Sequence, residues 1–189
     1  MEYYLIMLDG EKGNNKYIFA EPCADVEDQY MFQNGKIIKG WEPMQFECDL
    51  KKGSVVTEYL GNSYGWDIFS EKALGSFGDL ISNDVQLLPI KVINKTTKQE
   101  ISKYFVVNAL TILDALDLES SVYTYYDIEG RNEKWLSVIK YGIKGENVRE
   151  HHIFRLKESP ADVFVSEKFK KIVEKNKMLG IDFQRVKTS

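Results

Sequence analysis

The stretch SEKFKKIVEKNKMLGIDFQRV, residues 166–186, contains a helical pattern followed directly by a strand pattern. Apolar side chains from Phe169 to Val173 recur at the spacing of one helix face. Gly180 is the residue type that commonly follows the end of a helix. The stretch therefore predicts a helix over residues 167–177 and a strand over residues 181–186.

A second stretch, SEKALGSFGDLISNDVQLLPI at residues 70–90, lies 96 residues earlier and has the same order of features. Ser70 and Ser166 both occupy the position expected for a helix N-cap. The earlier stretch predicts a helix near residues 71–82 and a strand over 85–93. A repeated helix–strand unit suggests two related lobes, 1–95 and 96–189. Chance similarity is the alternative, because Ser-Glu-Lys is a common helix start.

The rest of the chain consists mainly of short apolar segments separated by turn residues, a pattern typical of strands. Residues 9–15, Asn34-Gly35 and residues 129–132 have turn composition, and the last two predict hairpins. The predicted strands are 3–9, 17–20, 30–33, 36–38, 46–50, 55–60, 103–109, 122–127, 134–141, 152–156 and 163–165. Many short strands and two helices predict an α+β fold, with a mostly antiparallel sheet framework, in a single domain over residues 1–189.

The charge of the chain is small and unevenly distributed. Its 189 residues include 25 basic and 29 acidic side chains, a net charge of −4. This balance argues against a nucleic-acid-binding protein, which usually has a basic excess. Residues 1–90 have a net charge of −8, whereas residues 91–189 have a net charge of +4. An acidic half either attracts a basic partner or keeps the protein soluble.

Features that would direct the chain to a membrane or out of the cell are not expected. The apolar run Tyr3–Leu8 is too short to span a bilayer, and no basic region precedes it as in a signal peptide. Cys23 and Cys48 are too few to form a disulfide scaffold. The sequence therefore predicts a cytoplasmic protein without a membrane partner.

Histidine and cysteine are the first candidates for catalytic chemistry. His151 and His152 are the only histidines, and adjacent side chains of a strand point to opposite faces. We therefore expect structural roles for both, and no metal site. A Cys–His nucleophile pair, with Cys23 or Cys48 as the thiol, has no local signature and stays an alternative.

Asp114 and Asp117 form the second candidate, because paired carboxylates can perform acid–base chemistry or bind a divalent cation. Aspartates in turns are also routine capping residues, and we expect that role here. No phosphate-binding loop or serine-hydrolase motif occurs in the sequence. The sequence thus predicts no catalytic, metal-binding or cofactor-binding residue, and a small enzyme using Asp114/Asp117 or a Cys–His pair is the alternative.

Three blocks of the chain occur in a characteristic order. They are Asp67–Lys72, Tyr104–Leu110 with Leu113–Asp117 and Ser120-Ser121, and the C-terminal series His152–Leu156, Val163–Lys168 and Leu179–Phe183. In this order they resemble a family of bacterial immunity proteins, the eleventh immunity family of the polymorphic-toxin classification, formerly a domain of unknown function.

The resemblance implies binding rather than catalysis. Members of such a family are cytoplasmic antidotes whose partner is a cognate toxin domain, and no cofactor is implied. The family provides no catalytic motif that could be placed on numbered residues of this chain. A generic adaptor or ligand-binding module, unrelated to toxins, is a further alternative.

A toxin contact is expected on the acidic N-terminal half. The proposed residues are Asp25, Glu27, Asp28, Trp41 and Glu42, because complementary charge speeds encounter with a basic partner and an aromatic side chain can act as an anchor. The alternative location is the aromatic segment that contains Tyr59, Tyr64 and Trp66.

Overall fold

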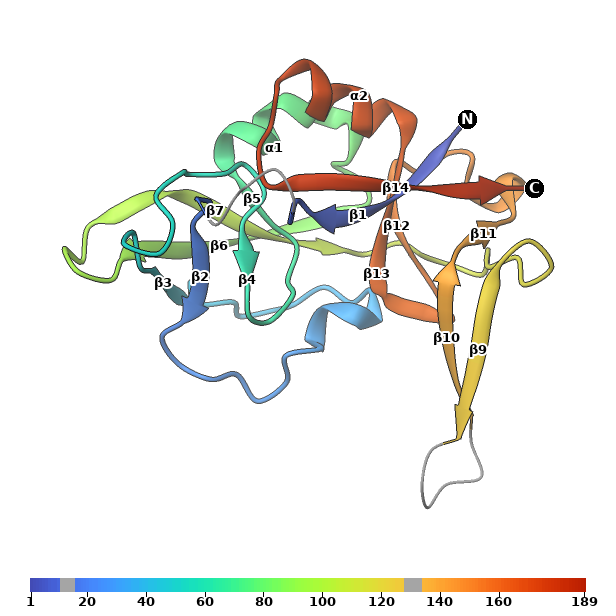
Figure 1. Ribbon diagram of the computed structural model, residues 1–189, viewed down its shortest axis with the longest axis horizontal. Helices are drawn as coiled ribbons and strands as arrows, with labels where there is room; N and C mark the ends of the chain where they lie inside the picture. Colours follow the sequence, from blue (N-terminus) through green and yellow to red (C-terminus); the bar gives the residue numbers. More distant parts are fainter. Residues whose placement is uncertain (11–15, 128–133) are drawn as a thin grey trace.

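The computed structural model describes residues 1–10, 16–127 and 134–189. This part of the chain forms two six-stranded sheets, two α-helices and a separate two-stranded hairpin (Figure 1). Among the strand pairs described, seven are antiparallel and four are parallel. The predicted α+β class, with a mostly antiparallel framework and two helices, is confirmed.

The first sheet combines the N-terminal strand with the C-terminal part of the chain. Strand β1 lies inside this sheet and pairs antiparallel with both β13 and β14. We call it the C-terminal sheet. Its order is β11 (Gly142–Ile143), β14 (Ile181–Thr188), β1 (Tyr3–Leu8), β13 (Ser159–Ser166), β12 (Ile153–Leu156) and β8 (Ile112–Leu113).

The second sheet, the N-terminal sheet, is built around the long antiparallel pair β6–β7. A lobe boundary at residues 95/96 falls between these two paired strands. The order is β4 (Gly61–Asn62), β2 (Phe19–Pro22), β3 (Gln45–Cys48), β6 (Val85–Asn94), β7 (Glu100–Ala109) and β5 (Ile68–Ser70).

Each helix connects two parallel strands of one sheet, with a single antiparallel strand between them. Helix α1 (Glu71–Phe77) joins β5 to β6 around β7, and α2 (Glu167–Lys175) joins β13 to β14 around β1. Both capping serines lie opposite a tyrosine of the middle strand, Ser70 opposite Tyr104 and Ser166 opposite Tyr3. The two stretches that lie 96 residues apart thus have the same order of strand, helix and strand.

The helices end earlier than predicted. Helix α1 stops at Phe77 instead of residue 82, because Gly78 has a positive φ of 52° and a short 3₁₀ turn follows. Helix α2 stops at Lys175, and Lys177 is the left-handed residue after it. Gly180 serves a different purpose, since a Cβ there would lie 2.1 Å from the Tyr59 carbonyl oxygen.

Three predicted strands are wrong. Residues 31–34 form a 3₁₀ turn and residues 36–38 form no strand, so the predicted hairpin across Asn34-Gly35 is absent. Gly35 is needed there for close packing, because a Cβ would lie 2.7 Å from the Leu110 carbonyl oxygen. Residues 55–60 form only isolated bridges, at Val55 and Tyr59. The predicted turns at residues 11–15 and 129–132 lie outside the described residues.

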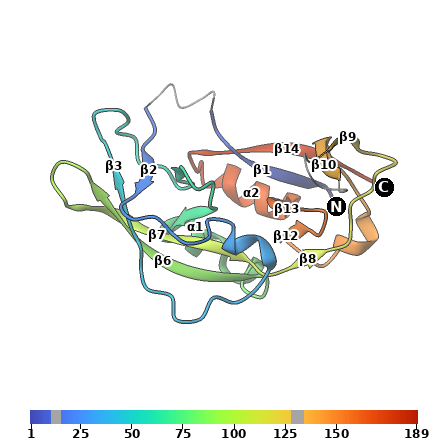
Figure 2. The same ribbon diagram turned by 90° about the horizontal axis from the view of Figure 1, so that it is seen from below.

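The helices lie next to each other and share one hydrophobic cluster with both sheets (Figures 1 and 2). The rings of Phe77 and Phe169 stack with centroids 4.1 Å apart and a 16° angle between planes. Ala109 of the N-terminal sheet and Val165 of the C-terminal sheet belong to the same cluster. Both helices therefore bury their apolar faces in a core that the two sheets contribute to jointly.

A buried ion pair also links the two sheets. The Arg155 guanidinium on β12 lies 2.9 Å from a carboxylate oxygen of Asp67, which comes just before β5. Tyr59 donates a hydrogen bond to the other carboxylate oxygen, and Arg155 also donates to the carbonyl groups of Pro160 and Ala161. Burial raises the pKa of Asp67, and the Arg155 guanidinium acts against that rise. The ion pair is thus buried, and neutral groups hydrogen-bond to each member: the Tyr59 hydroxyl to Asp67, and two backbone carbonyls to Arg155.

A histidine contacts Ser166, the N-cap residue of α2. Ser166 Oγ accepts the Phe169 N–H and lies 2.8 Å from His152 Nδ1. Burial, followed by the charge of Lys168, lowers the pKa of His152, with His151 acting in the same direction and Asp84 against it. A neutral Nδ1 can accept the Ser166 hydroxyl proton, which leaves Ser166 Oγ free to cap the helix.

Replacing either partner of the buried ion pair should strongly destabilise the protein. We expect Arg155→Met or Asp67→Asn to reduce the free energy of unfolding by about 3–5 kcal/mol, because each leaves a buried group without its partner. The double variant should lose less than the sum by about 1 kcal/mol or more. Urea denaturation of the four proteins measures both quantities, and strictly additive losses would contradict a coupled pair.

The His152 contact should make stability depend on pH. Because folding lowers the pKa of His152, the unfolded state takes up its proton at a higher pH than the folded state, starting near the ordinary pKa of about 6.5. The free energy of unfolding should therefore fall as pH decreases from about 7.5 to about 5.5. His152→Gln should reduce this dependence in urea titrations, whereas His151→Gln should retain it. An equal slope in the wild type and His152→Gln would contradict the assignment.

Candidate functional site

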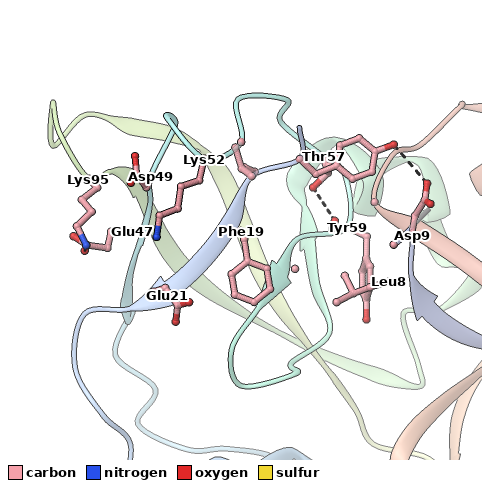
Figure 3. A pocket seen from close by; sticks show the side chains of 16 residues that line it. Leu8, Asp9, Phe19, Glu21, Glu47, Asp49, Lys52, Thr57, Tyr59 and Lys95 are labelled. Carbon is pink, nitrogen blue, oxygen red and sulfur yellow. Dashed lines mark hydrogen bonds and ion pairs between the residues drawn. The ribbon is translucent and has the colours of Figure 1, made fainter. Parts of the chain in front are cut away.

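A groove of about 640 Å³ opens where the end of β1 meets β2, β3 and the segment 53–61 (Figure 3). Leu8 reaches it from the C-terminal sheet, and Phe19 reaches it from the N-terminal sheet. We call it the β2–β3 groove. It lies on the solvent-facing side of β2 and β3, because Ala20 and Cys48 face the opposite, buried side as a cross-strand pair.

One end of the β2–β3 groove is apolar. Phe19 and Leu8 are each 48% exposed, an unusual degree for two large apolar side chains in one concave site. Gly61 lies between them, and a Cβ there would be 3.0 Å from the Phe19 ring and 3.4 Å from Leu8. The glycine therefore allows both side chains to lie against the backbone of β4.

The other end of the groove contains charged side chains. Figure 3 shows Glu21, Glu47 and Asp49 gathered there with Lys52 and Lys95. Glu21 lies directly opposite Glu47 in the β2–β3 ladder, a like-charge arrangement that destabilises a sheet.

The two glutamates differ in their partners. Glu47 forms ion pairs with Lys95 at 2.8 Å and Lys98 at 3.4 Å, and these lysines, Lys95 foremost, lower its pKa. Glu21 has no ion pair within residues 1–10, 16–127 and 134–189. Asp49 accepts only the Lys51 backbone N–H among the side-chain bonds of the described residues. The groove therefore offers two carboxylates to a cationic group.

The acidic residues of the predicted toxin contact lie in the long connection between β2 and β3. Asp25, Glu27, Asp28 and Glu42 are exposed, and an Asp28 oxygen accepts the Tyr30 N–H at 2.8 Å. Trp41 is half-buried, and its Nε1 donates to the Pro89 carbonyl at 2.8 Å. Its indole packs beside Phe32 and Trp66, so Trp41 forms part of the wall of a core.

The alternative aromatic segment is mostly internal. Tyr59 and Trp66 are buried, and Trp66 Nε1 donates to the Gln29 carbonyl at 2.8 Å. Tyr64 is half-buried and packs against Trp66. These side chains stabilise the N-terminal sheet and its long connection rather than offering a free surface.

A surface that sequence reasoning missed is the hairpin of β9 (Val122–Asp127) and β10 (Lys134–Lys140), which lies at the opposite end of the molecule from β2 and β3 (Figures 1 and 2). Trp135 is 65% exposed and lies directly opposite Tyr126, which is 59% exposed.

The residues of the β2–β3 groove were also not predicted from the sequence. Their signal is the Phe19-Ala20-Glu21 alternation, which predicts an exposed face with an apolar and an acidic side chain.

The candidate catalytic residues have separate structural partners. His151 Nδ1 lies 2.9 Å from an Asp84 oxygen, and His152 contacts Ser166 as described above. Burial raises the pKa of the Cys48 thiol to about 12, which opposes thiolate formation. Cys23 is exposed and receives a hydrogen bond of 3.6 Å from Gln45.

The two aspartates do not form a joint site. Asp114 is exposed and lies 3.9 Å from Lys157 Nζ. Asp117 accepts hydrogen bonds from Ser120 Oγ and the Glu119 N–H, and the Ser120 bond is the main cause of its lowered pKa. No three His, Cys, Asp or Glu side chains in the described part of the chain are grouped to hold a metal ion.

Comparison with other proteins identifies the family of the chain. Neither α-helix of the described residues has the length and apolar character needed to cross a membrane. No curated protein matches the chain. The model of the immunity protein family Imm11 matches residues 4–188, which includes both sheets, both helices and the hairpin. The chain belongs to the Imm11 family of immunity proteins.

Proposed function

We propose that this protein neutralises a cognate bacterial toxin in the cytoplasm by binding to it, without a chemical step of its own. The observation that carries the proposal is the family match over residues 4–188. A match of that length covers the folded unit rather than one motif, so the role of the family is proposed for the whole chain. We expect a protein partner, and neither nucleic acid nor membrane.

The surroundings of the candidate catalytic side chains support a binding role. A thiol with a pKa of about 12 is a poor nucleophile, and Asp114 and Asp117 each serve a different local contact. The enzyme alternative would need groups that converge on one pocket. The generic adaptor alternative has no specific observation in its favour.

We also propose that the chain is a single domain with two related units. The shared cluster around Phe77 and Phe169 supports one domain, since both sheets contribute to it. The common strand–helix–strand topology around residues 70–90 and 166–186 supports an internal repeat.

The acidic connection between β2 and β3 is proposed as one part of the toxin contact. Asp25, Glu27, Asp28 and Glu42 are exposed and can attract a basic partner over a distance. Trp41 directly precedes Glu42 in this connection, and the hydrogen bond to Pro89 keeps its indole in place. A rigid, half-buried aromatic side chain can contribute to binding with a small loss of entropy.

The proposed function predicts protection against one toxin. Bacteria that express the toxin domain encoded beside this gene should survive when they also express this protein, and the purified domains should form a stable complex. Growth assays and calorimetry test the two statements. An unrelated toxin domain is the control. Failure of both protection and binding with every toxin domain of the locus would contradict the proposal.

Charge reversal in the acidic connection should slow association. Asp25→Lys, Glu27→Lys and Asp28→Lys together should lower the association rate constant by about tenfold at low salt and weaken its salt dependence. The double variant without Asp28→Lys keeps the hydrogen bond to Tyr30 and controls for folding. Stopped-flow kinetics measures the rates. An unchanged rate and salt dependence would remove this connection from the contact.

A further inference from the structure

We propose that the β2–β3 groove is the docking site for a cationic segment of the toxin, in which an apolar side chain lies next to Lys or Arg residues. This inference rests on the proposed function, because the occupant is the toxin domain. The apolar side chain would contact Phe19 and Leu8, and the cationic groups would pair with Glu21 and Asp49.

The apolar end of the groove supplies the first reason. Phe19 and Leu8 come from different sheets, yet Gly61 brings both against the same short piece of β4. Each side chain leaves about half of its surface in water, although burying it would be favourable. An apolar side chain of a partner would cover both at once.

The unequal partners of the two opposed glutamates supply the second reason. Glu47 is neutralised by Lys95 and Lys98, whereas Glu21 faces it across the ladder without an ion pair in the described part of the chain. A like-charge pair directly opposite in a sheet is unfavourable. A cation from a partner would offset this repulsion, because Glu21 forms no ion pair with any side chain of residues 1–10, 16–127 and 134–189.

The backbone of the groove indicates how recognition occurs. Strand β2 pairs with β3 on one side, and its residues Phe19 and Ala20 pair with β4 on the other, so both sides of β2 are occupied where Phe19 lines the groove. A partner segment therefore cannot add as a further strand beside β2. It would lie across the face of the sheet and be recognised by side chains, with the apolar and charged ends of the groove fixing its direction (Figure 3).

The hairpin β9–β10 is the competing surface. It exposes Tyr126 and Trp135. Its charged side chains Lys134 and Asp127 pair with each other, so they indicate neither a cationic nor an anionic partner. Tyr126→Ala is therefore a matched control, since it truncates an exposed aromatic side chain on a strand far from the groove.

Binding of the adjacent-locus toxin domain to single variants tests the inference. Phe19→Ala should raise Kd about tenfold or more, mainly through faster dissociation, while Tyr126→Ala should leave Kd within about twofold. Glu21→Gln should weaken binding and at the same time leave the melting temperature unchanged or raise it, because it removes the repulsion with Glu47. A merely structural role for Glu21 would instead lower the melting temperature.

The outcomes separate the two proposals. If the wild type binds no toxin domain of the locus, the proposed function fails. If the wild type binds but Phe19→Ala and Glu21→Gln bind equally well, the groove inference alone fails. Loss of binding in Tyr126→Ala with both groove variants intact would place the contact on the hairpin.

A peptide titration provides a measurement that does not depend on the toxin. A short amidated peptide with the pattern Arg-Leu-Lys-Phe-Arg should shift the NMR amide signals of Phe19, Gly53 and Gly61, which line the groove. The matched peptide Glu-Leu-Glu-Phe-Glu should not. Equal shifts from both peptides, or shifts confined to β9 and β10, would overturn the inference.

Discussion

The ion pair between Arg155 and Asp67 connects the two halves of the architecture. It is buried, and it joins β12 of the C-terminal sheet to the entrance of β5 in the N-terminal sheet. Two charges removed from water tolerate little misalignment, so such a pair fixes the relative position of the elements that carry it. The hydrophobic cluster shared by α1 and α2 supplies non-directional stability, and the ion pair adds a geometric requirement.

The β2–β3 groove depends on this arrangement. Leu8 belongs to one sheet and Phe19 to the other, so the apolar end exists only when the two sheets dock in one orientation. Gly180, whose φ is 87°, brings the chain before β14 against the Tyr59 carbonyl and thereby closes the same seam. Because both sheets form this surface, the packing of the core between them holds its shape.

The local elements of the fold were largely accessible from the sequence, whereas their partners were not. The Ser166 cap and the apolar spacing after it predicted α2, and the turn composition of residues 129–132 predicted that β9 and β10 pair. The strand predicted at Val55–Leu60 was wrong, because an extended segment has the same sequence pattern whether it joins a ladder or forms only isolated bridges. The hairpin predicted at Asn34-Gly35 was wrong, because the glycine allows close packing against the Leu110 carbonyl group rather than a tight turn between strands.

The same limit applied to function. Exposed acids such as Glu27 were recognisable from composition, but the opposition of Glu21 and Glu47 depends on strand register, which composition does not contain. Trp41 and Trp66 have the residue type of an interface anchor, and their ring contact and their hydrogen bonds to Pro89 and Gln29 distinguish core from surface. The Phe19-Ala20-Glu21 alternation was present in the sequence and would have indicated an exposed strand face.

The position of β1 has a consequence for the order of events during synthesis. This strand precedes the other described strands in the chain, yet its two neighbours are β13 and β14, which lie within residues 159–188. During synthesis β1 therefore has neither of its neighbouring strands until nearly all of the described chain has left the ribosome. Contacts this distant in sequence slow folding, because a long loop must close before they form. Leu8 therefore reaches the groove only after translation of β14, and shorter nascent chains lack a complete binding surface.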